Sequence, residues 1–332
     1  MDPAGPDLPG TLPRGPHPTA GPTTVTMPRW PGVVLAVGGV VLAVGSLGAA
    51  MAAAQGQLGV DDPAILAWLA VVGAAAFVAG LVYIAIRTLR VRRHLPPERY
   101  RGPSVLTLVL LSLALAFLLT VPFGEDAAAL LLGEGELTWL GAIVLLVSTQ
   151  AALLVVSWLL VFRPGALAGL PSLPGRNAAR AVASGVGWGF GAWVMATVVV
   201  AAVVFLLESL GIEPEPQAAE LAIAMLDPWL VIVAVVILAP IAEEIFFRGV
   251  VFNALLREGG RRWAIIGSSA LFAVIHISLV AFLPIFLLGV ALAWIYQRTG
   301  NLLAPIAMHA TVNGISVALA LLVRFDLVRL PV

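Results

Sequence analysis

Two adjacent glutamates, Glu243 and Glu244, stand near the middle of a long apolar stretch, residues 228–256. Arg248 follows four residues later, so three ionisable side chains interrupt a segment that is otherwise suited to lipid. A charged residue at the centre of a bilayer costs roughly 2.5–3.5 kcal/mol on insertion scales. Such residues mark functional sites in membrane proteins, and a carboxylate at this depth can activate water or carry a proton.

Helical spacing predicts different roles for the two carboxylates. Glu244 and Arg248 are four residues apart, so on a helix their side chains can meet and neutralise each other. Glu243 is turned about 100° away from Glu244 around the same helix, and it has no such partner on that helix. We therefore expect Glu243 to be the reactive carboxylate and Glu244 to be paired with Arg248.

Two histidines lie in the apolar segments that follow. His276 shares a helix face with Phe272, four residues before it. His309 shares a face with Asn313 in the same way. Glu243 and His276 lie about 20 and 21 Å from the cytoplasmic ends of their spans, and His309 about 10 Å, at roughly 1.5 Å per residue. A carboxylate and two imidazoles in a water-filled pocket can activate water, directly or on a metal, or can pass protons or bind a cation for transport.

The composition is that of a polytopic membrane protein. Of 332 residues, 61% are hydrophobic and only 11% are charged, and the mean hydropathy is +1.04, whereas soluble domains are about 25% charged. The net charge is zero, so no nucleic-acid partner is indicated. Cysteine is absent, which excludes disulfides, thiolate catalysis and Cys-ligated metals. We expect an all-α bundle of about eight or nine transmembrane helices, an integral protein of a bacterial cell membrane.

The apolar segments predict the order and orientation of the spans. They are residues 32–54, 64–87, 104–123, 138–162, 183–207, 228–256, 263–281, 282–298 and 302–323, with only Pro284 between the seventh and the eighth. Arg-rich loops follow the second, fourth and sixth spans and alternate with acidic loops, so the positive-inside rule places them and the N-terminus in the cytoplasm. Nine spans place the C-terminus outside, against the preference of Arg324 and Arg329; a re-entrant span would place it inside.

The chain divides into four predicted regions. Residues 1–30 are rich in Pro and Gly and are expected to be a disordered tail. Residues 31–182 hold N-terminal transmembrane helices to which the sequence assigns no role, and glycines in the first of them favour close helix packing. Residues 183–323 form the predicted core with the polar residues, and residues 324–332 form a C-terminal tail.

Three short motifs resemble those of one protein family. EEIFFR at 243–248, FAVIH at 272–276 and HATVN at 309–313 are similar to the EExxxR, FxxxH and HxxxN motifs of the CAAX-protease and bacteriocin-processing (CPBP) family, and they occur in that family's order. This family includes intramembrane proteases similar to the Ras-converting prenyl-protein endopeptidase. The resemblance covers roughly residues 183–323. It implies an α-helical intramembrane endopeptidase that works in the lipid bilayer on a membrane-proximal peptide or protein.

The resemblance also implies a role for each polar residue. Glu243 is then the general base that activates water, and His276 assists in proton transfer. His309 and Asn313 polarise the scissile carbonyl and stabilise the oxyanion. Glu244 supports the site together with the two structural residues, Arg248 and Phe272.

The cofactor and the reaction are open at this stage. Glu243, His276 and His309 could hold Zn²⁺ with an open position for water, but the chain has no zinc-binding helix of the His-x-x-x-Glu type, and a metal-free glutamate mechanism fits equally well. One alternative is a scaffold or immunity protein of the same fold, which would need only the pair of Glu244 and Arg248. Another is a proton-coupled transporter, which the absence of a convincing internal repeat disfavours.

Overall fold

The computed structural model describes residues 27–54, 63–124, 138–167, 177–212, 223, 226–276 and 278–327. These residues form helices and the connections between them, which confirms the all-α prediction. The predicted N-terminal tail lies outside the described residues as far as residue 26, and so do most of the acidic loops and residues 328–332 of the C-terminal tail.

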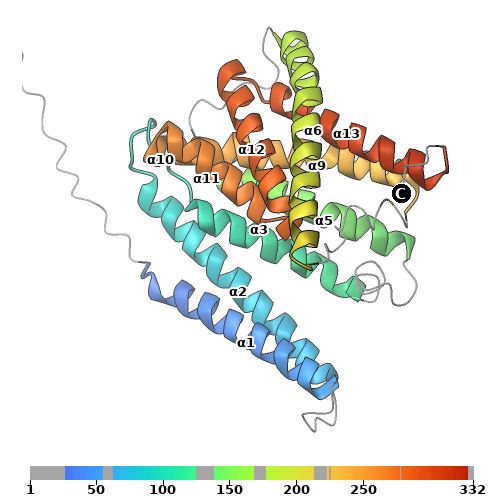
Figure 1. The fold of residues 1–332 in the computed structure, drawn as a ribbon. Coiled ribbons are helices and arrows are strands. Elements are labelled where there is room, and N and C mark those ends of the chain that lie inside the picture. Colours follow the sequence, from blue (N-terminus) through green and yellow to red (C-terminus); the bar gives the residue numbers. More distant parts are fainter. Residues whose placement is uncertain are drawn as a thin grey trace, which may run out of the picture.

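Helical segments follow one another along the whole described chain (Figure 1). In chain order they are α1 (Trp30–Ala54), α2 (Pro63–Arg92), α3 (Val105–Thr120), η1 (Val121–Phe123), α5 (Trp139–Ser157), η2 (Trp158–Phe162), α6 (Ala178–Ser209), α8 (Pro228–Val231), η3 (Ile232–Leu238), α9 (Ala239–Glu244), η4 (Ile245–Phe252), α10 (Asn253–Gly259), α11 (Arg261–Val274), α12 (Leu279–Thr299) and α13 (Leu303–Arg324). Within the described ranges, eight helices are long and apolar enough to cross a membrane. The chain is therefore an integral membrane protein.

α1 and α2 form an N-terminal hairpin at one edge of the molecule (Figure 1). Their glycines allow the two backbones to touch: a Cβ on Gly80 would lie 2.6 Å from the carbonyl oxygen of Gly32. Gly32 and Gly39 of the first span thus pack closely as predicted, whereas Gly38, Gly45 and Gly48 face open space. The last residue of α2, Arg92, pairs with Glu258 of α10 at 2.8 Å. This ion pair connects the hairpin to the rest of the protein.

The seventh predicted span is wrong in its boundary and its length. α11 has 14 residues, or about 21 Å at 1.5 Å per residue, which is shorter than the ~30 Å hydrocarbon core. The chain leaves the helical conformation after α11, and Ser278 begins α12 by accepting a hydrogen bond from the N–H of Ala281 at 3.2 Å. Pro284, which was expected to separate two spans, lies inside α12. The capping serine, not the proline, marks the helix start.

The end of α13 lies beside the start of the sixth span, Pro228–Gly259. Arg324 donates from Nη1 to the carbonyl oxygens of Ile223 at 2.7 Å and Leu226 at 2.6 Å. The start of the sixth span is the end that the positive-inside rule places outside. This contact therefore favours an outer C-terminus, which requires that the short α11 also carries the chain across the membrane in addition to the eight longer helices. The two carbonyl oxygens supply partners for an arginine that the rule would place inside.

The sixth span contains wide helical turns, in which an N–H bonds to a carbonyl five residues earlier. At the end of η3, the N–H of Ala239 donates to the carbonyl oxygen of Ala234. The next residue, Pro240, has no N–H, so the carbonyl of Val235 lacks a donor on its own helix. Asn313 of α13 donates from Nδ2 to that carbonyl at 2.9 Å. Wide turns of this kind occur frequently at functional sites.

Two further helices support the sixth span and α13. α6 crosses α13 (Figure 1), and its Gly189 allows close approach, because a Cβ there would lie 2.6 Å from Cβ of Thr311. α5 packs in turn against η3, α9 and η4 of the sixth span. The polar residues of the last third of the chain are therefore enclosed by helices on several sides.

Candidate active site

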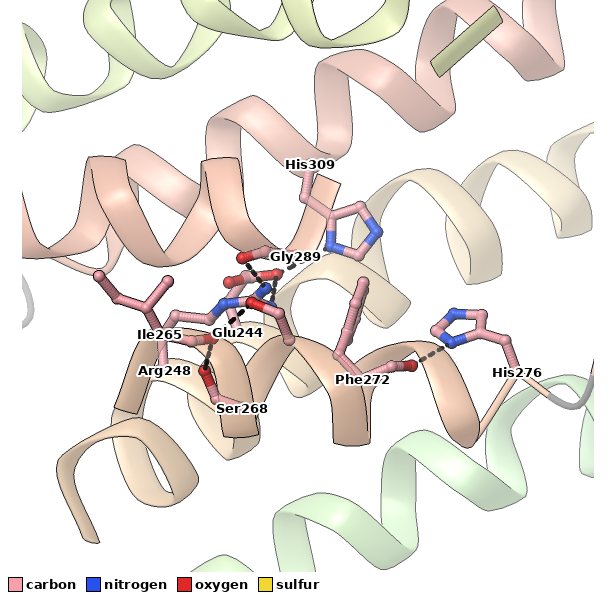
Figure 2. A network of polar contacts seen from close by, with 9 residues as sticks. Glu244, Arg248, Ile265, Ser268, Phe272, His276, Gly289 and His309 are labelled. Carbon is pink, nitrogen blue, oxygen red and sulfur yellow. Dashed lines mark hydrogen bonds and ion pairs between the residues drawn. The ribbon is translucent and has the colours of Figure 1, made fainter. Parts of the chain in front are cut away.

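The side chains of the candidate site come from four neighbouring elements, α9, η4, α11 and α13. Glu244 of α9 lies at the centre of the site (Figure 2). Its Oε1 accepts a hydrogen bond from Nη1 of Arg248 at 2.8 Å and lies 3.0 Å from Nδ1 of His309. The side chains of Glu244 and Arg248 are both 0% exposed. The first contact confirms the pair that the spacing predicted. The second joins α9 to α13 and was not predicted.

The contact with Glu244 determines which nitrogen of His309 carries a hydrogen. A carboxylate can only accept hydrogen bonds, so Nδ1 of His309 is the donor. Nε2 then holds a free lone pair in the neutral ring, or an N–H when the ring is protonated. A carboxylate that orients an imidazole in this way also stabilises its protonated form.

Arg248 links three helices through one guanidinium group. Besides Glu244, it donates from Nη2 to the carbonyl oxygen of Gly289 on α12 at 3.0 Å. Its Cζ lies 4.6 Å from the centre of the Phe272 ring on α11. Gly289 permits this close packing, because a Cβ there would lie 3.0 Å from Cβ of Ser269 on α11. The structural role predicted for Arg248 stays a prediction, which these contacts favour. Gly289 carries no polar side chain that could have identified its part from the sequence.

Phe272 lies between the two imidazoles (Figure 2). Its ring centre is 4.9 Å from that of His276 and 5.7 Å from that of His309, in edge-to-face arrangements. His276 is exposed at the end of α11, and its Nδ1 lies 2.6 Å from the carbonyl oxygen of Phe272. Because a carbonyl only accepts, Nδ1 of His276 also carries the hydrogen and Nε2 is free. The pairing of Phe272 with His276 that the sequence predicted is therefore present.

Glu243 differs from its neighbour in its surroundings. Its side chain is buried, at 8% exposure. Among the described residues, its Oε2 is a buried atom without a hydrogen-bond partner. A buried acceptor costs free energy unless it receives a hydrogen bond, so this oxygen is suited to hold a small donor such as water.

Asn313 contacts the sixth span rather than another side chain. One of its two N–H groups donates to the carbonyl oxygen of Val235, as described above. An amide nitrogen has two hydrogens, so the second can still donate to a substrate oxygen. The predicted oxyanion role of Asn313 stays a prediction.

The candidate zinc ligands do not form a metal site in this arrangement. Within the described part of the chain, no three side chains of His, Asp or Glu gather closely enough to hold a metal ion. Glu243, His276 and His309 therefore do not fit the set of three protein ligands that a catalytic zinc requires.

An apolar groove opens beside the site, between η3 and α13. Its volume is about 450 Å³, and it is lined by residues such as Val236, Gly314 and Phe325. Gly314 follows Asn313 directly, and Val236 follows the carbonyl that Asn313 contacts. A hydrophobic chain lying in this groove would end next to the polar residues.

Residues 225–315 match the family of type II CAAX prenyl endopeptidases, Rce1-like. This segment is therefore similar to an Rce1-like domain. It begins just before the sixth span and ends two residues after Asn313, so it contains the whole candidate site. The match confirms the family that the three motifs predicted, and at the level of the family it supports a CAAX-type intramembrane protease. The wider core of residues 183–323 stays a prediction.

Two bacterial proteins resemble the chain. "Putative membrane peptidase YdiL" of Bacillus subtilis (strain 168) is 32% identical over 112 residues, which are 34% of this chain and 46% of that protein. "UPF0177 protein YxdF" of Lactococcus lactis subsp. lactis (strain IL1403) is 30% identical over 78 residues, 23% of this chain and 42% of that protein. The chain thus spans less than half the length of either relative. No solved structure matches it. Both relatives are bacterial, and the name of the first describes a membrane peptidase, which agrees with the predicted bacterial membrane protein.

Proposed function

We propose that the chain is an intramembrane endopeptidase that hydrolyses a peptide bond near the membrane with a water molecule activated by Glu243. The observation that carries this proposal is the contrast between the two carboxylates. Oε1 of Glu244 is engaged by Arg248 and His309, whereas no hydrogen bond or ion pair of this kind joins Glu243 to another described residue; Oε2 of each carboxylate is buried and has no partner among the described residues. Glu243 is therefore the carboxylate available to take a proton.

The reaction follows from these positions. Glu243 removes a proton from water, and the water oxygen attacks the carbonyl carbon of the scissile bond. Negative charge develops on the carbonyl oxygen, to which Nε2–H of protonated His309 and the second N–H of Asn313 would donate. The C–N bond then breaks, and the proton held by Glu243 passes to the departing amine nitrogen, with Nε2 of exposed His276 as a route for further protons. The products are a carboxylate and an amine.

The mechanism requires the imidazolium form of His309, because only that form has an N–H at both ring nitrogens. Nδ1–H then bonds to Glu244 while Nε2–H faces the oxyanion.

Replacement of Glu243 by glutamine tests the proposal. Wild-type protein and Glu243→Gln are reconstituted in liposomes with a library of fluorogenic peptides that carry an apolar anchor. Loss of a general base lowers rates by about 10²–10⁴-fold, so cleavage by the variant should fall in that range. Glu208→Gln, at an exposed position near the end of α6, is the matched control and should cleave normally. Full cleavage by Glu243→Gln would falsify the proposal, and a wild-type protein that cleaves no peptide would favour the scaffold alternative.

A further inference from the structure

A second buried acceptor lies on the helix that packs against α9. Gln150 is on α5, in a segment that the Rce1-like match does not cover. Its Oε1 is buried and has no hydrogen-bond partner among the described residues. An amide oxygen buried in a membrane protein without a donor is costly, so its retention here calls for a function.

The neighbours of Gln150 on α5 show which part of the sixth span it faces. Leu146, one turn before it, packs in the apolar cluster that includes Val235 of η3. Leu153, one turn after it, belongs to the cluster that includes Phe246 of η4. Residues spaced by three or four lie on the same helix face. Gln150 is therefore on the same face of α5 as members of both clusters, on a helix that packs against α9.

Depth agrees with this placement. Gln150 is the twelfth residue of a 24-residue span, and Glu243 is the sixteenth of a 32-residue span, so each lies at the middle of its helix. The order of the two apolar clusters shows that α5 and the sixth span run in the same direction. Both residues therefore lie near the middle of their spans, on helices that contact each other.

We propose that Gln150 is a positioning residue that holds the attacking water together with Glu243. Oε1 of Gln150 and Oε2 of Glu243 are both buried acceptors, and so is Oε2 of Glu244, whose Oε1 is already held by Arg248 and His309. One water molecule has two O–H donors, so it can donate one hydrogen to each oxygen and leave its lone pairs free. This inference rests on the proposed peptidase function and adds a residue from outside the matched domain.

The shared water defines the direction of attack. When Glu243 takes one hydrogen as a proton, the other stays on the oxygen that bonds to the carbonyl carbon, and Gln150 continues to accept it. That hydrogen leaves with the new carboxyl group of the product. Gln150 gains and loses no proton, so its part is to orient the nucleophile, and a misplacement of about 1 Å at this step can cost about 100-fold in rate.

Two variants of Gln150 test the proposal with the fluorogenic peptide that the wild-type protein cleaves fastest. Gln150→Leu removes the acceptor at similar size, and we expect kcat to fall about 100-fold with KM unchanged. Gln150→Glu keeps an acceptor oxygen and adds a carboxyl group beside Glu243. Two neighbouring carboxylates raise the pKa of one of them, so the acidic limb of the kcat–pH profile should move to higher pH.

Gln297 provides the matched control. Its Oε1 is also buried without a described partner, but the residue lies near the C-terminal end of α12, away from Glu243 in the sequence of the spans. Gln297→Leu and Gln297→Glu should change neither kcat nor the pH profile. An unchanged kcat in Gln150→Leu, or an unmoved acidic limb in Gln150→Glu, overturns the proposal. If Gln150→Leu fails to fold, the pH profile of Gln150→Glu decides. The two proposals fail separately: an active Glu243→Gln variant removes the peptidase mechanism, whereas inactive Glu243→Gln with normal Gln150 variants removes only this inference.

Discussion

At the scale of single residues, the two adjacent glutamates differ in their contacts. Glu244 connects the residues of the site, whereas Glu243 is the carboxylate that we propose reacts. Glu244 contacts both Arg248 and His309, and Arg248 extends the network to the carbonyl of Gly289. A scaffold would need only the pair of Glu244 and Arg248. The additional contact with His309 orients the imidazole ring. The proposed peptidase mechanism requires such an oriented ring, whereas a scaffold does not.

The buried ion pair leads to a prediction about stability. Arg248→Met leaves Glu244 as a buried charge with a lost partner, which should lower the free energy of unfolding by about 3–5 kcal/mol. The double variant Glu244→Gln/Arg248→Met removes both charges, so denaturant unfolding in detergent should show much of this stability restored. Cleavage should remain low in the double variant, because His309 has lost its carboxylate. Recovery of activity along with stability would contradict the orienting role of Glu244.

The arrangement of the candidate ligands leads to a second prediction. Because Glu243, His276 and His309 do not gather into a metal-binding group, chelation should leave activity intact. Peptide cleavage is measured after treatment with 1,10-phenanthroline, and the metal content of the purified protein is measured in parallel. Loss of cleavage that added Zn²⁺ restores would show that the water is activated on a metal.

Some of these contacts were predictable from the sequence and others were not. The pair of Glu244 and Arg248 follows from a spacing of four residues on a helix. The contact of Glu244 with His309 joins residues 65 positions apart, and only the packing of α13 on α9 brings them together. Asn313 was expected to share a task with His309, but its partner is a backbone carbonyl released by a wide turn, which residue spacing does not reveal.

At the scale of elements, α6 determines how closely α13 can approach the rest of the protein. Gly189 lies against Thr311 and the carbonyl of Met308 on α13, whereas Gly187 on the same helix has open space around it. The sequence predicted the helices themselves well, since long apolar runs are decisive. It misplaced the boundary between α11 and α12, because a proline six residues into a helix and a serine cap produce similar breaks in an apolar run.

The two glycines provide a matched pair of variants. Gly189→Val should displace α13 and with it His309, which should reduce cleavage by about 100-fold if the imidazole moves by 1 Å. Gly187→Val adds the same side chain to the outward face and should retain activity. Both are compared by cleavage of the same fluorogenic peptide and by thermal unfolding. If both variants reduced cleavage equally, the valines would be acting by destabilising α6 itself and not by displacing α13.

At the scale of the whole molecule, the contact of Arg324 with Leu226 places the end of α13 beside the outer end of the sixth span. The N-terminal hairpin stands at one edge (Figure 1), and Arg92 at the end of α2 pairs with Glu258 of α10, within the segment that matches the Rce1-like family. The Rce1-like domain is therefore held by helices on which the family comparison gives no information.

The orientation can be measured directly because the chain has no cysteine. Arg262→Cys and Asp326→Cys each introduce a single thiol at an exposed position. In spheroplasts, a membrane-impermeant maleimide should label Asp326→Cys and should label Arg262→Cys only after lysis. Labelling of both thiols, or of neither, in intact spheroplasts would place the two positions on the same side of the membrane.

The hydrogen bond from Asn313 to the carbonyl of Val235 has a consequence for how the site could evolve. A helix that slides by one residue moves its side chains by about 1.5 Å and rotates them by about 100°, so a small slip of α13 would carry His309 out of reach of Glu244. Because Pro240 has no N–H, the carbonyl of Val235 on the opposing span remains an acceptor. Asn313 can reach this carbonyl in one register of α13 only. Insertions in the loops around α13 can therefore accumulate without misaligning the chemistry, because the alignment depends on a bond inside the membrane rather than on loop length.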